Sequence, residues 1–163
     1  MTAPTIHEPK AEVQATKDTS GRLVWAGPLA VAAATLAKVL CYYFVTRVLQ
    51  ITMVFPEQFP PPEVTPLPVT DVVLFSFIFG AGAVIIFWLV AQSSRRPTRT
   101  YLAISTFVLL ISIFLPLKIP TPPVPTSSKW SLIMMHIIGA VVIVGVLLAL
   151  CPPRFIQDTG STA

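Results

Sequence analysis

Four long apolar segments restrict what this chain can fold into. They cover residues 23–46, 72–91, 101–117 and 130–150. Each has the length of about 17–25 residues with which an α-helix crosses roughly 30 Å of hydrocarbon. Their apolar residues are continuous and do not alternate with polar ones, which argues against the strands of a membrane β-barrel. We therefore predict four membrane-spanning helices.

Composition favours a membrane protein over a soluble domain. Of the 163 residues, 54% are hydrophobic and only 11% are charged, whereas a soluble domain carries about 25% charged residues. The net charge of +4 could indicate a nucleic-acid partner, but the basic residues lie beside the apolar segments, as membrane-flanking residues do. We therefore expect contact with the lipid bilayer and none with nucleic acid.

The polar ends of the chain lie outside the predicted membrane domain, residues 23–151. Residues 1–22 are polar, mixed in charge and poor in bulky apolar side chains, so we expect a disordered tail. Residues 152–163 are expected to form a second disordered tail. The first apolar segment begins too late, and is too long, for the apolar part of a cleaved signal peptide, which predicts a retained helix.

The connections between the segments differ in character. The first, from Phe55, and the third, from Pro116, are rich in proline, which lacks an N–H and fixes φ, so polyproline II and turns are expected there. The second, residues 92–100, is short and should join antiparallel neighbours. Together these features predict an all-α fold, a polytopic membrane protein with an up-down-up-down four-helix transmembrane bundle.

The positions of Lys and Arg predict the orientation of this bundle. Seven basic residues flank one side, namely Lys10, Lys17, Arg22, Arg95, Arg96, Arg99 and Arg154. Three flank the other side, namely Arg47, Lys118 and Lys129. Because cytoplasmic segments carry the excess of Lys and Arg, we expect both termini in the cytoplasm and both proline-rich connections outside.

The apolar segments contain no Asp or Glu. Ion-coupled carriers usually place a carboxylate within the membrane, and intramembrane hydrolases need paired carboxylates or a His and Glu cluster. The sequence also lacks an H-E-x-x-H motif, a nucleophile elbow and a glycine-rich phosphate loop. We therefore expect no enzymatic activity, no cofactor and no bound metal.

Lys38 is the least usual residue of the apolar segments, because a lysine near the centre of a span costs about 2.5–3.5 kcal/mol on insertion scales. Tyr42 follows it one turn later on the same helix face. In a functional interpretation, Lys38 is a buried cation that binds an anionic or carbonyl-bearing ligand. In a structural interpretation, its side chain extends towards the interface or hydrogen-bonds a neighbouring helix. The sequence is compatible with both.

His136 and Asp71 complete the set of candidate ligand-binding residues. His136 lies at a depth similar to that of Lys38, and Gly139 and Ala140 on its face would let another helix approach closely. Its structural alternative is a hydrogen bond between helices. Asp71 begins the second segment, where it could instead cap the helix N-terminus. We hypothesise that these residues form one cluster in the outer half of the bundle.

Polar and small residues also recur along two of the segments. Tyr101, Ser105 and Ser112 form a stripe on the third segment, and Ser76 and Gly80 lie four residues apart on the second. Small residues at such spacing allow helix backbones to approach without a hydrophobic driving force. We interpret both stripes as helix-packing surfaces.

Several short motifs resemble those of one membrane family. The motifs are W-x-G (Trp25, Gly27), Leu-Pro (Leu115, Pro116) and Met-His (Met135, His136). The same family has a proline-rich outer connection and an arginine-rich inner turn, as this sequence does. Over roughly residues 23–153 the chain resembles the four-helix bacterial membrane family known as domain of unknown function 6069. The resemblance implies a bacterial cytoplasmic membrane location and supplies no activity.

The sequence leaves two main functional hypotheses. The first is a non-enzymatic accessory or scaffold protein, with an unidentified membrane protein or a second copy of the chain as partner. The alternative is a small transporter or a lipid- or ligand-binding bundle with a polar site in the outer half of the membrane; an enzyme ranks third. A binding pocket requires Lys38, Tyr42 and His136 to converge, whereas a scaffold would leave them dispersed.

Overall fold

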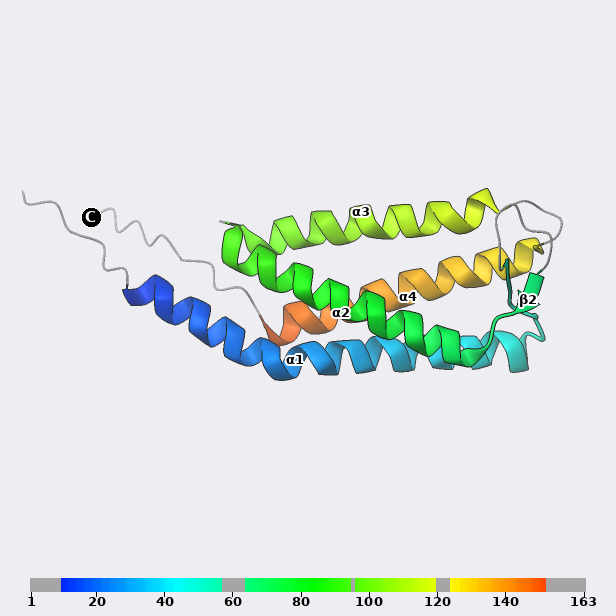
Figure 1. The fold of residues 1–163 in the computed structure, drawn as a ribbon, viewed down its shortest axis with the longest axis horizontal. Coiled ribbons are helices and arrows are strands. Elements are labelled where there is room, and N and C mark those ends of the chain that lie inside the picture. Colours follow the sequence, from blue (N-terminus) through cyan, green and yellow to red (C-terminus); the bar gives the residue numbers. More distant parts are fainter. Residues whose placement is uncertain (1–9, 57–63, 95, 120–123, 152–163) are drawn as a thin grey trace, which may run out of the picture.

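The protein forms a bundle of four long α-helices in the computed structural model (Figure 1). The structure describes residues 10–56, 64–94, 96–119 and 124–151. The helices are α1 (Lys10–Tyr43), α2 (Val69–Ser93), α3 (Pro97–Lys118) and α4 (Thr126–Leu150). Successive helices run along the molecule in opposite directions (Figure 1). The prediction of an all-α, four-helix membrane fold is confirmed.

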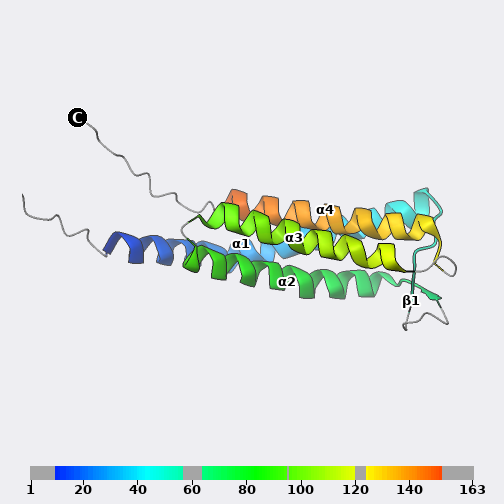
Figure 2. The same cartoon turned by 90° about the horizontal axis from the view of Figure 1, so that it is seen from above.

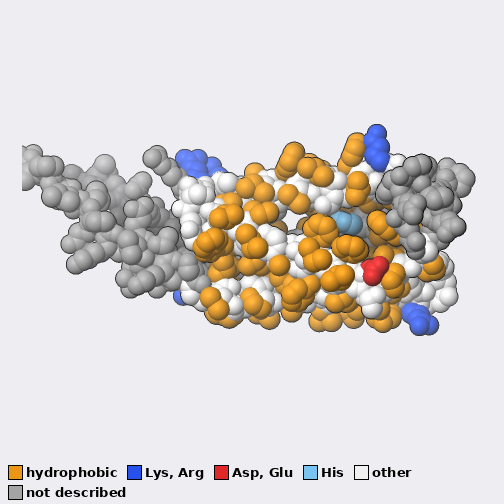
Figure 3. Space-filling view, viewed as in Figure 1, with side chains coloured by type: hydrophobic (Ala, Val, Ile, Leu, Met, Phe, Trp, Pro, Cys, Tyr) orange, Lys and Arg blue, Asp and Glu red, His pale blue; other side chains and the backbone are white. Residues whose placement is uncertain are grey.

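All four helices contain a span long and apolar enough to cross a membrane, and these spans are Gly21–Val48, Val69–Ser93, Pro97–Lys118 and Thr126–Leu150. Hydrophobic side chains cover the middle of the face in Figure 3, and Lys and Arg lie towards its two ends. Large apolar side chains point outwards; Phe77 on α2 is 62% exposed and Phe107 on α3 is 64% exposed. Such a surface is unfavourable in water, so it contacts the lipid bilayer.

The first helix begins earlier than the sequence suggested. It starts at Lys10, inside the segment 1–22 that we expected to be disordered, and its first turns project beyond the other helices (Figures 1 and 2). An existing membrane helix removes the cost of nucleation, so the Ala, Glu, Gln and Lys residues before it extend it readily. The expectation for residues 1–9 and 152–163 lies outside the described residues.

A short β-hairpin follows α1 and the π-helical turn η1 (Phe44–Val48) that continues it. Strands β1 (Val54–Pro56) and β2 (Val64–Pro66) pair antiparallel, with Val54 opposite Pro66. The sequence predicted polyproline II and turns in this connection, which is wrong for the strand residues; residues 57–63 lie outside the described part of the chain. In a two-stranded ribbon each strand has a free edge, which tolerates the missing N–H of proline. We call this end of the bundle the hairpin end.

The hairpin is fastened across the helices. The hydroxyl of Ser128, in the first turn of α4, accepts a hydrogen bond of 2.9 Å from the backbone N–H of Val54. The N–H of Leu67 donates to the carbonyl of Met53 over 2.8 Å, and Met53 is buried. Beneath the hairpin lies the hairpin-end cluster, which consists of Cys41, Val45, Met53, Val72, Leu132 and Met135. This cluster closes the hairpin end.

The opposite end carries the short connection between α2 and α3, and we call it the turn end. Buried residues of all four helices pack there into the turn-end cluster, which includes Ala26, Ala30, Phe87, Tyr101 and Leu147. The rings of Phe87 and Tyr101 meet edge to face, with centroids 4.9 Å apart, a favourable arrangement. α2 and α3 therefore adjoin here, as the short connection predicted.

Candidate functional site

A cavity of about 280 Å³ lies between the two clusters. Its lining comes from α2, α3 and α4, together with Ala34 and Lys38 of α1. α2 and α3 diverge from the turn end towards the hairpin end (Figure 1), and the cavity, which both helices line, is partly open. Figure 3 looks onto this lipid-exposed face. The cavity is therefore accessible from the side of the bundle.

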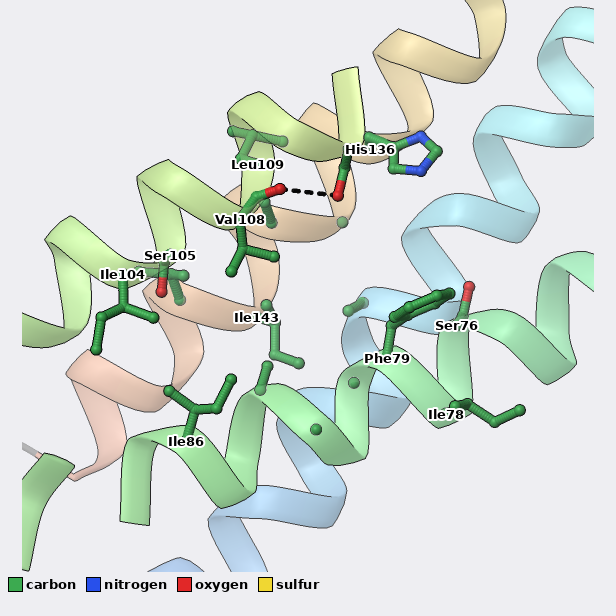
Figure 4. Close-up of a pocket in the computed structure, with 18 of the residues that line it drawn as sticks. Ser76, Ile78, Phe79, Ile86, Ile104, Ser105, Val108, Leu109, His136 and Ile143 are labelled. Carbon is green, nitrogen blue, oxygen red and sulfur yellow. Dashed lines mark hydrogen bonds between the residues drawn. The ribbon is translucent and has the colours of Figure 1, made fainter. Parts of the chain in front are cut away.

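The cavity wall is mainly apolar, with a few polar groups from each helix. Figure 4 shows Phe79 and Ile86 of α2 facing Ile104 and Val108 of α3, with Ile143 of α4 behind them. The polar side chains of the wall are Lys38, Ser76, Tyr101, Ser105, Ser112 and His136. An apolar pocket with a small number of convergent polar groups is the usual form of a ligand-binding site.

Lys38 reaches the cavity by crossing the backbone of α4. A Cβ atom added to Gly139 would lie 3.0 Å from Nζ of Lys38 and closer still to its Cε. A larger residue at this crossing would force the end of the lysine side chain to move. The structural interpretation had this side chain extending towards the interface or hydrogen-bonding another helix, but Lys38 lines the cavity and has no hydrogen bond within the described ranges.

His136 contributes its imidazole to the same cavity. Its Nδ1 lies 2.7 Å from the carbonyl oxygen of Leu132, one turn earlier on α4. A carbonyl only accepts hydrogen bonds, so Nδ1 carries the proton and donates, which leaves Nε2 available. The alternative of a bond between helices is wrong, because this bond lies within α4. His136 and Lys38 therefore line one cavity.

Tyr42 and Asp71 do not line the cavity. The hydroxyl of Tyr42 donates to the carbonyl of Leu67 over 2.9 Å, at the hairpin end. Asp71 lies in the first turn of α2, but the N-cap residue is Pro68 and the cap has no side-chain hydrogen bond. The expected side-chain cap by Asp71 is therefore wrong, although its charge still lies where the helix dipole favours it. Of the predicted cluster, only Lys38 and His136 line the same cavity.

Five cavity residues had been interpreted from the sequence as packing residues. Ser76 of α2 and Tyr101 and Ser105 of α3 line the cavity, and Ser76 and Tyr101 are almost fully buried. The hydroxyl of Tyr101 lies near Ser105 but has no hydrogen-bond partner among the described residues. Their shared stripe was visible in the sequence, but a stripe does not reveal whether it meets a helix or a cavity.

Ser112 and Gly80, the other two of these five residues, also line the cavity. Ser112 donates to the carbonyl of Val108 in its own helix over 2.9 Å (Figure 4). Gly80 packs closely as predicted, since an added Cβ would lie 3.1 Å from Val31 on α1. Across the described parts of the chain, no three His, Cys, Asp or Glu side chains come together as a metal site requires.

Four apolar helices, a lipid-exposed surface and a side-opening cavity define a multi-pass helical membrane protein. The chain belongs to a family of proteins of unknown function, the DUF6069 family, whose model matches residues 18–150. The resemblance inferred from the short motifs is thereby confirmed. No curated protein and no solved structure matches the chain. The function must therefore be inferred from the cavity itself.

Proposed function

We propose that this protein is a non-enzymatic, multi-pass protein of the bacterial cytoplasmic membrane that binds an amphipathic ligand in its cavity. One observation carries the proposal: an apolar cavity inside the membrane spans contains both Lys38 and His136. Ionisable residues at such depth are costly and are usually retained for a role. This arrangement favours the ligand-binding alternative over a pure scaffold, which needs no such cavity.

The closure of both ends supports entry of the ligand from the bilayer. At the hairpin end, Met53 and the bond between Ser128 and Val54 cover the helices. At the turn end, Tyr101 packs against Phe87. The opening lies between α2 and α3, on a face of lipid-exposed side chains. A molecule already dissolved in the membrane therefore has the shortest route to the site.

The proposal that the protein is not an enzyme rests on the chemistry of the cavity wall. The described lining offers Lys38, His136, one tyrosine and three serines, but no carboxylate or thiol. A nucleophilic serine needs a base within hydrogen-bond reach, and the one described hydrogen bond of a cavity serine runs from Ser112 to a backbone carbonyl. These groups suit recognition of a polar head group better than catalysis.

The proposed orientation follows from the excess of Lys and Arg at the turn end and its neighbouring tails. Both termini would lie in the cytoplasm and the hairpin end outside. Topology reporters fused after Ala163 and between Pro60 and Pro66 test this arrangement. We expect a cytoplasmic signal from the first fusion and an external one from the second; the reverse pattern would refute the orientation and leave the cavity unaffected.

Native mass spectrometry of the protein in mild detergent tests the binding function. We expect the purified protein to carry a lipid-sized mass, and Gly82→Phe to abolish it, since Gly82 lines the cavity with open space before it. Gly145→Phe is the matched control, because Gly145 also faces open space but lies outside the cavity wall. Equal ligand loss from both variants, or none from either, would contradict the proposal.

The same spectra address a protein partner. A second copy of the chain, or another membrane protein, is the competing occupant of the opening between α2 and α3. In that case the spectra would show a dimer or a complex that Gly82→Phe dissociates and Gly145→Phe does not. This result would favour the accessory or scaffold function over the binding of a small amphiphile.

A further inference from the structure

We propose that the ligand is a single-chain carboxylate amphiphile, of the long-chain fatty-acid class. Its carboxylate would be bound by Lys38 and His136, and its chain would lie along the apolar wall between α2 and α3. This inference rests on the proposed function and specifies the chemistry of the same site. It is carried by the charge, the hydrogen-bonding groups and the size of the cavity.

The charge of the cavity calls for an anion. Lys38 lies well inside the span Gly21–Val48, and a buried charge is costly unless it is paired. Asp71 is the one carboxylate whose side chain the structure describes, and it does not line the cavity. Within the described residues the counter-charge to Lys38 is therefore absent from the cavity wall, and an anionic ligand would supply it.

The groups beside Lys38 suit a carboxylate better than a phosphate. One ammonium balances the single charge of a carboxylate, whereas a phosphate monoester carries about −1.5 to −2 at pH 7. Bidentate phosphate sites favour arginine, and the described wall contains none. His136 has Nδ1 engaged by Leu132, so Nε2 is the atom that can share a proton with a carboxyl group.

The size of the cavity favours one chain. Its volume of about 280 Å³ lies at the lower limit of the roughly 300–1,000 Å³ found for ligand pockets. The small residues Gly82 and Ala83 leave the space along α2, and Phe79 borders it. One acyl chain can fill this space and continue through the side opening into the bilayer. A two-chain lipid would leave its second chain outside.

Gly139 is a positioning residue in this arrangement. Because its missing side chain is what allows Lys38 to cross α4, Gly139→Ala must displace the ammonium from its place in the cavity. The charge of the protein stays the same in this variant. Gly139→Ala therefore tests whether the position of the ammonium matters, whereas replacing Lys38 removes the ammonium altogether.

Competitive binding of matched single-chain probes tests the inference. Purified protein in nanodiscs is mixed with palmitic acid, hexadecanol and a single-chain lysophosphatidic acid, and the bound fractions are compared by native mass spectrometry. We expect palmitic acid to bind in preference to both others. Lys38→Met should weaken palmitic acid binding roughly 10- to 100-fold, the usual effect of a lost charged hydrogen bond, and should leave hexadecanol unchanged.

Matched variants distinguish the possible outcomes. Lys118→Met removes the same charge from α3, where the ammonium lies 4.9 Å from the ring of Phe114 and outside the cavity wall, and should change nothing. Lys38→Arg should retain the preference for the acid, and Gly139→Ala should lose it. A thermal melt of each variant checks that it is folded, and a Lys38→Met protein that fails to fold leaves Gly139→Ala and Lys38→Arg to decide.

Three results would overturn the inference. If palmitic acid and hexadecanol bind equally well, or if both Lys38→Met and Gly139→Ala retain the preference for the acid, the carboxylate site is refuted while the proposed function stands. If lysophosphatidic acid binds more tightly and depends on Lys38, the head group is a phosphate. If none of the probes binds, both the inference and the proposed function fail.

Discussion

The two parts of α3 have opposite surroundings. At the turn end, Tyr101 is 1% exposed and packs against Phe87. Further along, Phe107 and Leu110 are 64% and 60% exposed, on the part of the helix that diverges from α2. One tightly packed end therefore holds a helix whose other part contacts lipid and borders a cavity. The part of α3 that packs against the other helices is thus distinct from the part that borders the cavity.

The largest difference between the two regions should appear on truncating a leucine in each. Leu147 is fully buried in the turn-end cluster, so Leu147→Ala should destabilise the protein by about 2–5 kcal/mol. Leu110 contacts lipid, which is as apolar as leucine, so Leu110→Ala should have little effect. Unfolding in mixed detergent measures both. Equal destabilisation would remove the distinction between the two regions.

Two glycines on α4 test how closely the cavity wall is packed. In Gly139→Ala the new methyl group forces the flexible end of Lys38 to move, which should offset part of the roughly 1 kcal/mol that alanine adds to a helix. Gly145 faces open space, so Gly145→Ala should be neutral or stabilise the helix by up to about 1 kcal/mol. Thermal melts compare the two. If Gly139→Ala stabilised the protein more than Gly145→Ala, the crossing of Gly139 by Lys38 would be contradicted.

Two buried serines of α4 test the closure of the hairpin end. Ser128→Ala removes the acceptor of the Val54 N–H and should destabilise the protein by about 1–2 kcal/mol, because a backbone donor loses its partner. Ser131 donates only to Ser127 in its own helix, so Ser131→Ala should have the smaller effect. Protease accessibility of the hairpin region gives an independent measure. A larger effect at Ser131 would contradict the fastening of the hairpin to α4.

The smallest effect on stability is expected for Tyr101, which packs in the turn-end cluster and also lines the cavity. The hydroxyl of Tyr101 has no partner among the described residues, so Tyr101→Phe should change the free energy of unfolding by less than about 0.5 kcal/mol, since no hydrogen bond is lost. Loss of ligand from the same variant, without loss of stability, would assign the hydroxyl to the ligand.

The helices could be predicted from the sequence because the thickness of the bilayer fixes their length and excludes charge from them. The β-hairpin could not, because prolines such as Pro56 and Pro66 disfavour a strand unless its edge is free, and pairing between distant segments leaves no local pattern. The extension of α1 back to Lys10 was also not predicted, because composition alone does not show that the membrane-spanning part of the same helix removes the cost of nucleation.

The candidate site was predicted in part. Lys38 and His136 were found because an ionisable residue among apolar neighbours is visible in the sequence itself. Tyr42 and Asp71 were included for their depth, but depth does not determine the neighbour that a side chain meets; Tyr42 meets the hairpin. Tyr101 does pack against Phe87, as interpreted from the sequence. That Tyr101 and Ser76 also border a cavity was not predicted, because the divergence of α2 from α3 arises only from tertiary structure.

The early start of α1 has a consequence for the surroundings of the membrane. Its residues 10–20 precede the span that begins at Gly21, and at 1.5 Å per residue they form a rod of roughly 16 Å. The rod continues the helix that carries Lys38. This helical extension therefore holds any segment joined to its first residue at a fixed distance from the bilayer.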